Sequence, residues 1–230
     1  MDSNTVQSGC ANSHVAISAW VFDLDGTISD PLQGMLESVN HALLSIDCAA
    51  VEAAQMHAHI GPPLEATMAE FAGTDDAETV ALLIERYRSY YKDKGFVLNS
   101  LYPGIADLLQ ALSNQSITMG VCTAKTAPVA TNILQHFGIA GYFSFVSGGD
   151  IGVTKASQLE KLLQQKSIDR NALMIGDRKF DLEAAHANGI RSCGVTWGYG
   201  SLEELRTEQP HMIAQSPADL QALLRGGAAA

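Results

Sequence analysis

The chain has 230 residues, of which 47% are hydrophobic and 17% charged, a composition that excludes a disordered or fibrous protein. Its net charge of −11 argues against a nucleic-acid polymer as partner, because such a surface repels the phosphate backbone. We see neither a signal peptide nor the roughly 20 consecutive apolar residues of a membrane span. Four widely spaced cysteines fit reduced thiols, so we expect a cytoplasmic protein.

Short apolar runs alternate with helical patterns along most of the chain. The expected strands are residues 18–22, 117–122, 142–146, 172–175 and 191–195. The expected helices are residues 105–112, 127–137, 158–165 and 180–188, and Gly138 and Gly189 lie where helix C-caps are expected. Strands that alternate with helices form a parallel sheet covered on both faces. The predicted fold class is therefore α/β, with a doubly wound, Rossmann-like core.

One stretch, from about Gln33 to Val97, contains helical patterns only. It is too long for a crossover connection between two strands, so it predicts an inserted all-helical cap domain. The hinges are expected around Asp30-Pro31 and Asn99–Gly104. The predicted domains are a core of residues 15–32 and 99–225, a cap of residues 33–98, and flexible termini at residues 1–14 and 226–230.

Reactive side chains follow the expected strands where each strand ends, which is where open parallel sheets bind their ligands. In chain order these side chains are Asp23, Asp25, Thr123, Lys155, Asp177 and Asp181. Clustered carboxylates with no His or Cys suit a hard cation, above all Mg²⁺. A hydroxyl, the backbone N–H groups after it and a lysine can bind phosphoryl oxygens. Lys125 stays open between a further phosphate-binding cation and a solvated surface lysine.

The ordered set D-x-D-G-T, a strand-end Thr, a Lys and G-D-x-x-x-D resembles the haloacid dehalogenase-like (HAD) hydrolase superfamily. The matching segments are Phe22-Asp23-Leu24-Asp25-Gly26-Thr27, Tyr102-Pro103-Gly104, Gly176-Asp177-Arg178-Lys179-Phe180-Asp181 and Val195-Thr196-Trp197-Gly198-Tyr199-Gly200. They are similar to the phosphoglycolate phosphatase-like branch, which carries a C1-type helical cap. One departure is that Ala156-Ser157 follows Lys155, where the family often has Pro.

The resemblance implies a Mg²⁺-dependent phosphomonoester hydrolase that acts through an aspartyl-phosphate. It implies that Asp23 is the nucleophile and that Asp25 is the general acid and base. The implied phosphate-binding residues are Thr123, Ala124 and Lys155. The implied metal site consists of Asp23, the backbone carbonyl of Asp25 and Asp177, with Asp181, Gly26 and Thr27 in support.

Other functions stay open, namely a sugar-phosphate phosphomutase, a 5′-nucleotidase-type phosphatase and a non-catalytic regulator with this fold. Asp25 argues against a dehalogenase, which needs no acid at that position. We expect a small phosphorylated metabolite as substrate, no membrane partner, and a monomer or homodimer. His57 and His59 lie two apart in a predicted helix, so we expect them to be poor metal ligands. Trp197 and Tyr199 are expected to pack or to line a loop beside the site.

Overall fold

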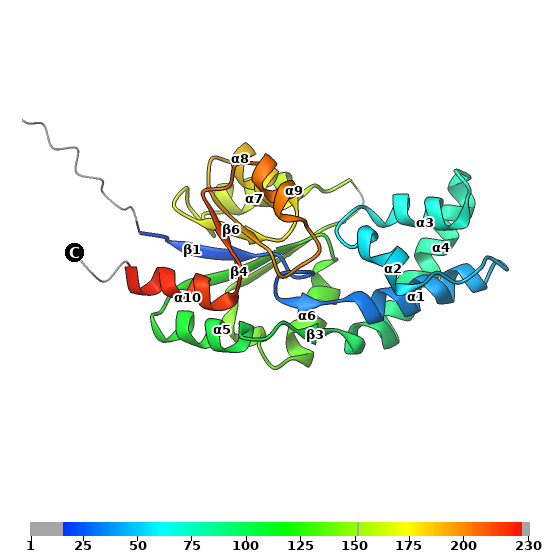
Figure 1. The fold of residues 1–230 in the computed structure, drawn as a ribbon, viewed down its shortest axis with the longest axis horizontal. Coiled ribbons are helices and arrows are strands. Elements are labelled where there is room, and N and C mark those ends of the chain that lie inside the picture. The colour runs from blue at the N-terminus through cyan, green and yellow to red at the C-terminus, as the bar shows by residue number, and fades with distance from the viewer. Residues whose placement is uncertain (1–15, 151, 227–230) are drawn as a thin grey trace, which may run out of the picture.

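The computed structural model describes residues 16–150 and 152–226, which form a parallel sheet with helices on both faces and a helical lobe beside it (Figure 1). The sheet strands are β1 Ala19–Phe22, β4 Thr118–Thr123, β5 Phe145–Gly148, β6 Leu173–Gly176, β7 Arg191–Val195 and β8 Met212–Ala214. They lie in the order β5-β4-β1-β6-β7-β8, and every pair is parallel. This arrangement confirms the predicted doubly wound α/β core.

Helices cover both faces of this sheet. They are α5 Ile105–Asn114, α6 Ala127–His136, α7 Lys155–Gln164, α8 Lys179–Ala187, α9 Leu202–Thr207 and α10 Pro217–Gly226. In Figure 1, α5 and α10 lie on one face, and α7, α8 and α9 lie on the other. Successive side chains of a strand point to opposite faces, so Trp20 joins the core cluster that contains Leu109 of α5, whereas Val21 joins the one that contains Leu159 of α7. Burial on both faces explains why β1 is apolar throughout.

The two predicted C-cap glycines follow helix ends as expected. Gly138 comes one residue after the C-cap of α6 and has a φ of 70°, and Gly189 comes one residue after the C-cap of α8 and has a φ of 60°. Both are left-handed conformations that glycine adopts without steric cost. The predicted ends of these helices are confirmed.

The structure corrects two predicted elements and adds others. The strand predicted at residues 142–146 begins only at Phe145, because a 3₁₀ turn, η4 Ala140–Tyr142, takes up the start of the aromatic run. Helix α7 begins at Lys155, three residues before its predicted start, since the Thr154 side chain caps it by accepting from the Ser157 N–H. Strand β8 has three residues, too few for a periodic pattern to predict it.

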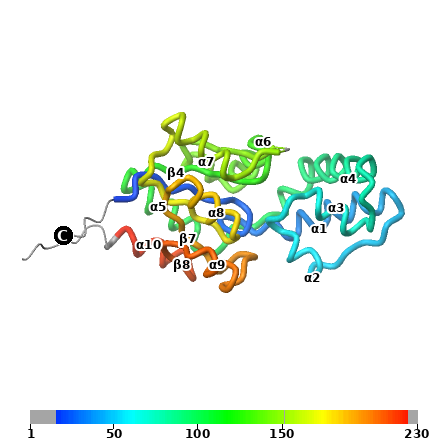
Figure 2. Tube along the Cα trace, turned by 90° about the horizontal axis from the view of Figure 1, so that it is seen from above, coloured from blue at the N-terminus to red at the C-terminus, as the bar shows by residue number. Residues whose placement is uncertain are grey.

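Every element assigned between Leu32 and Leu98 is helical, which confirms the predicted cap. The elements are α1 Leu32–Leu44, α2 Ala53–Met56, η1 His57–His59, α3 Leu64–Ala72, α4 Ala77–Tyr90, η2 Tyr91–Gly95 and η3 Phe96–Leu98. The cap lies beyond the carboxyl ends of the sheet strands, and Figure 2 shows it as a separate lobe from a second direction. A substrate at that edge of the sheet would therefore lie between core and cap.

The two chain segments that connect core and cap pair with each other. Strand β2 Ser29–Asp30 runs antiparallel to β3 Ser100–Leu101. Both connections coincide with the predicted hinges, but the domain boundaries themselves stay a prediction. Among the described residues, no helix combines the length and apolarity needed to cross a membrane.

Candidate active site

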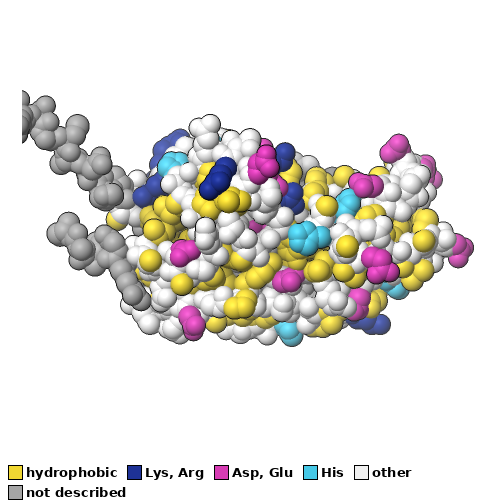
Figure 3. All heavy atoms as spheres, in the orientation of Figure 1, with side chains coloured by type: hydrophobic (Ala, Val, Ile, Leu, Met, Phe, Trp, Pro, Cys, Tyr) yellow, Lys and Arg dark blue, Asp and Glu magenta, His cyan; other side chains and the backbone are white. Residues whose placement is uncertain are grey.

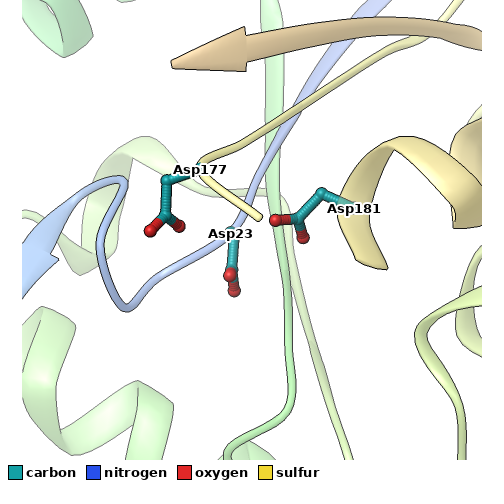
Figure 4. A group of neighbouring side chains, drawn as sticks. All are labelled: Asp23, Asp177 and Asp181. Carbon is teal, nitrogen blue, oxygen red and sulfur yellow. The ribbon is translucent and has the colours of Figure 1, made fainter. Parts of the chain in front are cut away.

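Three buried aspartates come together at the carboxyl edge of the sheet. Asp23 directly follows β1, Asp177 directly follows β6, and Asp181 lies in the first turn of α8 (Figure 4). Each offers one carboxylate oxygen, and these oxygens all lie within 4.8 Å of one another. Among the described residues, this group could hold a metal ion. His57 and His59, which we expected to be poor metal ligands, do not belong to it.

The buried carboxylates disfavour one another's charge. Burial, with Asp181 and Asp23 adding repulsion, raises the pKa of Asp177 to about 8. Burial also raises the pKa of Asp181 to about 6, although the adjacent Lys155 ammonium opposes the rise. Asp177 and Asp181 are therefore hard to ionise together at neutral pH without a further cation. An all-oxygen donor set of this kind fits Mg²⁺.

The turn after β1 is shaped to hold Asp177. Gly26 has a φ of 78°, and a Cβ built on it would lie 2.1 Å from Asp177 Oδ2. The Thr27 hydroxyl donates to Asp177 Oδ1 at 3.2 Å, and the Tyr199 N–H donates to Asp177 Oδ2 at 2.8 Å. Gly26 is needed both for the left-handed backbone and for the close approach. Both Gly26 and Thr27 lie beside Asp177, and their supporting role stays a prediction.

Lys155 bridges Asp23, the candidate nucleophile, and Asp181 of α8. Its Nζ lies 3.0 Å from Asp23 Oδ2 and also donates to Asp181 Oδ1. The backbone N–H of Arg178 donates to Asp181 Oδ2 at 3.1 Å, so protein donors contact both oxygens of Asp181. Burial disfavours the Lys155 ammonium, but Asp181 and Asp23 outweigh that cost and raise its pKa. The ammonium stays charged beside Asp23.

Asp23 and Thr123 are fixed by their own backbone surroundings. Asp23 Oδ1 accepts from the Leu24 N–H at 2.7 Å, and the Asp23 N–H donates to the Ile175 carbonyl of β6 at 2.8 Å. Thr123 is buried at the end of β4, and Ala124 follows it in the turn before α6. The Thr123 Oγ1 accepts from the Lys125 N–H at 3.2 Å, a bond that does not use the hydroxyl hydrogen, which can still be donated to a ligand.

Asp25 pairs with Lys125, a contact that the sequence did not predict. Lys125 Nζ lies 2.5 Å from Asp25 Oδ2 and 4.6 Å from the ring centre of Tyr91. Burial raises the pKa of Asp25 above its ordinary value, and Lys125 offsets part of the rise. Burial likewise disfavours the Lys125 ammonium, but Asp25 outweighs it and raises the pKa of Lys125. The surface-lysine alternative for Lys125 is therefore wrong, since only 11% of its side chain is exposed.

The loop that follows β7 contacts the turn after β1 and the Asp177 carboxylate. The Trp197 indole N–H donates to the Thr27 carbonyl at 3.0 Å, and Tyr199 binds Asp177 through its backbone and Asp30 through its hydroxyl. Gly198 is required in the same loop, because a Cβ there would lie 2.4 Å from Asp177 Oδ2. The sequence did not decide whether Trp197 and Tyr199 pack or line a loop beside the site. The glycines on either side of Tyr199 were the one sign that this loop approaches another part of the backbone closely.

Two further contacts join core and cap. The Arg178 guanidinium donates to Glu204 Oε1 of α9 at 2.9 Å and to the cap carbonyl of Ile60. The His57 ring meets the Tyr199 ring edge-on, with centres 4.8 Å apart. These contacts hold the cap against the loops that carry the acidic residues. The sequence motifs named Arg178 and Tyr199 but gave no sign that they reach the cap.

A cavity of about 630 Å³ lies at the opposite, amino-terminal edge of the sheet. Ser18, Thr118, Leu163 and Arg170 are among the residues that line it. Asp23, Asp25, Asp177 and Asp181 do not line this cavity, so it is separate from the acidic cluster. We assign the site by its chemistry, because parallel sheets bind ligands at the other edge.

Comparisons with known proteins agree with the motifs. A family model described as haloacid dehalogenase-like hydrolase matches residues 20–195. Tyrosine-protein kinase PtkA of Mycobacterium tuberculosis is 36% identical over 185 residues, and the chain spans only 62% of the length of PtkA. That alignment covers 78% of this chain. A 5′-nucleotidase of Pseudomonas aeruginosa is 35% identical over 207 residues, covering 88% of this chain and 92% of the relative.

Further matches cover nearly the whole chain. A phosphoglycolate phosphatase of Pectobacterium atrosepticum is 30% identical over 217 residues, which are 91% of this chain and 93% of the relative. The crystal structure of a predicted phosphatase from Clostridium acetobutylicum is 33% identical and superposes with a TM-score of 0.84. The superposition covers 92% of this chain and 100% of that chain. The likeness therefore extends over both the sheet and the helical cap.

Proposed function

The chain belongs to the haloacid dehalogenase-like hydrolase family, as its motifs predicted, and from that premise we propose that it is a Mg²⁺-dependent phosphomonoester hydrolase. The observation that carries this proposal is Asp23, buried at the carboxyl end of the central strand with Lys155 Nζ 3.0 Å away. A carboxylate nucleophile next to a fixed cation suits attack on a phosphate ester. The phosphatase class predicted from the sequence agrees with the phosphatases among the matched proteins.

In the proposed reaction, an Asp23 oxygen forms a bond to phosphorus while the bond from phosphorus to the leaving oxygen breaks. Asp25 gives its proton to that oxygen and releases the alcohol. Asp25 then takes a proton from a water molecule, which attacks phosphorus and frees Asp23 together with inorganic phosphate. One residue can serve both steps, because it is left deprotonated by the first.

The residues that would hold Mg²⁺ are Asp23, the backbone carbonyl of Asp25 and Asp177, with Asp181 in support. When bound, the cation neutralises charge between the nucleophile and the incoming phosphate dianion. The raised pKa of Asp177, at about 8, supports this proposal, since a cation at the cluster would favour the ionised carboxylate. The all-oxygen donor set supports the choice of Mg²⁺.

Thr123, Ala124 and Lys155 are the proposed phosphate-binding residues. The hydroxyl of Thr123 and the backbone N–H groups after it supply neutral donors, and Lys155 supplies positive charge. Acidic side chains are spread over core and cap on the face drawn in Figure 3, in line with the net charge of −11. A small anionic substrate therefore depends on cations inside the site for its binding.

The substrate is proposed to be a small phosphorylated metabolite, bound between core and cap. Two candidates follow from the relatives, phosphoglycolate and a nucleoside 5′-monophosphate, since proteins named for both reactions align over most of this chain. We also propose that residues 33–98 form a cap that opens and closes about the β2–β3 connections. The cytoplasmic location and the monomer or homodimer stay proposals from the sequence.

A panel of phosphomonoesters tests this function. Phosphoglycolate, nucleoside 5′-monophosphates and sugar phosphates are compared by kcat/KM, in Mg²⁺ and in EDTA, with Asp23→Asn as the control. Release of inorganic phosphate that requires both Mg²⁺ and Asp23 supports the proposal. Isomerisation of a sugar phosphate, transfer from ATP to a tyrosine peptide, or activity retained by Asp23→Asn would contradict it.

A further inference from the structure

Lys125 makes contacts that a phosphate-binding lysine does not need. Its backbone is held on both sides, because its N–H donates to Thr123 Oγ1 at 3.2 Å and its carbonyl accepts from the Gly149 N–H at 2.8 Å. Its side chain pairs with Asp25 Oδ2 at 2.5 Å, whereas the side chain of Lys155 pairs with Asp23. The lysine is therefore fixed at the general acid, not at the nucleophile.

The cap supplies the other contact of Lys125. The Tyr91 ring, at the start of η2, faces Lys125 Nζ at 4.6 Å, a distance typical of a cation–π interaction. That ring is itself held in place, since it stacks on Tyr87 with centres 5.6 Å apart. The Tyr91 hydroxyl donates to Asn99 Oδ1 at 3.0 Å, which ties it to the connection between cap and core. A core lysine thus lies between the core acid and a cap aromatic.

The two oxygens of Asp25 differ in their surroundings. Oδ2 is paired with Lys125, whereas Oδ1 is buried and has no hydrogen-bond partner among the residues that the structure describes. An unpaired buried carboxylate oxygen is costly, and such an atom calls for an explanation such as a missing ligand. The pairing at Oδ2 leaves Oδ1 as the oxygen whose hydrogen-bonding capacity is unused.

We propose that Lys125 is a positioning residue, which holds Asp25 by Oδ2 so that Oδ1 can protonate the leaving oxygen, and that Tyr91 links this arrangement to the cap. The inference rests on the proposed phosphatase function. As the Asp23–phosphorus bond forms and the bond to the leaving oxygen breaks, Asp25 loses its proton and becomes a carboxylate. The adjacent Lys125 ammonium stabilises that carboxylate, which makes proton donation easier.

Esters with different leaving groups test this role. Aryl phosphates such as p-nitrophenyl phosphate release a stable anion and need little help from an acid, whereas alkyl phosphates depend on protonation. The measured quantity is kcat/KM, because it covers the steps up to release of the alcohol and excludes later hydrolysis of the phosphorylated aspartate. Both esters are chosen from those that the wild-type protein hydrolyses.

We expect Lys125→Met to lose about 10²-fold in kcat/KM for the alkyl ester and less than about 5-fold for the aryl ester. Lys125→Arg should recover most of the alkyl activity, since it restores the cation. The matched control is Lys94→Met, because Lys94 is exposed and also lies over a tyrosine ring, that of Tyr90 at 5.5 Å. It should change neither rate. Lys125→Gln is measured in parallel in case the Met variant does not fold, and thermal melting checks each protein.

An equal loss on both esters would overturn the inference. It would mean that Lys125 acts on the phosphoryl group or only stabilises the fold. No loss on either ester would overturn it as well. A wild-type protein that hydrolyses no phosphomonoester would instead remove the proposed function and the inference with it. The two failures are therefore distinguishable.

Discussion

The two sides of the site differ in where their residues come from. The nucleophile side belongs to the core alone. It consists of the buried carboxylates of Asp23, Asp177 and Asp181, together with Lys155. The acid side, Asp25, shares its partner Lys125 with Tyr91 of the cap. The difference suggests that the core alone organises bond formation to phosphorus. In the proposed mechanism, protonation of the leaving group by contrast also involves the cap, through the contact of Tyr91 with Lys125.

The largest effect should come from the nucleophile. We expect Asp23→Asn to lose at least about 10³-fold in kcat for alkyl and aryl esters alike, as a covalent nucleophile is removed. The equal loss would separate this side of the site from the Lys125 side, where the loss should depend on the leaving group. Near-normal turnover by a folded Asp23→Asn protein would contradict the assigned roles.

The next effect concerns metal binding to the core carboxylates. Adding Mg²⁺ should raise the melting temperature of the wild-type protein, because a cation relieves repulsion among Asp23, Asp177 and Asp181. Mg²⁺ at 100 times its Kd would stabilise the fold by about 2.7 kcal/mol. Asp177→Asn should abolish most of this response, whereas Asp75→Asn, at an exposed aspartate of the cap, should keep it.

This result would be read from thermal melts alone, without an activity assay. A Mg²⁺ response of Asp177→Asn as large as that of the wild-type protein would argue against Asp177 as a ligand. Such a result would not bear on the proposed phosphate-binding residues Thr123, Ala124 and Lys155.

A smaller, purely structural effect is expected at the turn after β1. Gly26→Ala should cost about 2 kcal/mol or more in the free energy of unfolding, from a left-handed backbone and a Cβ 2.1 Å from Asp177 Oδ2. Gly73→Ala is the matched control, since Gly73 has a φ of 64° and open space around its Cβ position. It should cost about 1 kcal/mol, from the backbone term alone. Equal costs in urea unfolding would mean that the close approach to Asp177 is unimportant.

The smallest effect lies outside both sides of the site, at the edge of the sheet. His211 Nδ1 lies 3.2 Å from the Ser192 N–H and 3.2 Å from its Oγ, and His186 Nε2 lies 2.9 Å from the same hydroxyl. Burial, followed by the charges of His186 and Arg191, lowers the pKa of His211. The unfolded chain therefore binds the proton more readily, so stability falls as pH drops below about 6.5.

His211→Asn should reduce this pH dependence by about 0.5 kcal/mol or less, because the ring is largely exposed and solvent screens its charge. Urea unfolding at pH 7.5 and pH 5.5 measures it, with His41→Asn of the cap as the control. An unchanged pH dependence in His211→Asn would show that the cluster around Ser192 does not respond to protonation.

The nucleophile side was largely predictable from the sequence. The apolar run before Asp23 predicts a buried central strand, and the spacing of Asp177 and Asp181 predicts two carboxylates at a helix start. Parallel strands bring their carboxyl ends to one edge, so Asp23 and Asp177, which are 154 positions apart, could be expected to meet. The structure places them within the same cluster.

The acid side was not predictable in this way. The pairing of Lys125 with Asp25, and the place of Tyr91 beside it, are tertiary contacts between segments with no shared periodicity or motif. Strand β8 and the start of β5 escaped prediction for a related reason. A three-residue edge strand and an aromatic run after a helix are decided by pairing with neighbouring strands, not by local pattern.

The central claim is that phosphate passes through Asp23. Wild-type protein mixed with excess substrate in Mg²⁺ is quenched in acid during turnover, and its peptides are analysed by mass spectrometry. We predict a phosphoryl group on the peptide that contains Asp23, and none in Asp23→Asn treated in the same way. A phosphoryl group on any other residue would contradict the account, as would steady release of phosphate with Asp23 unmodified in every quenched sample.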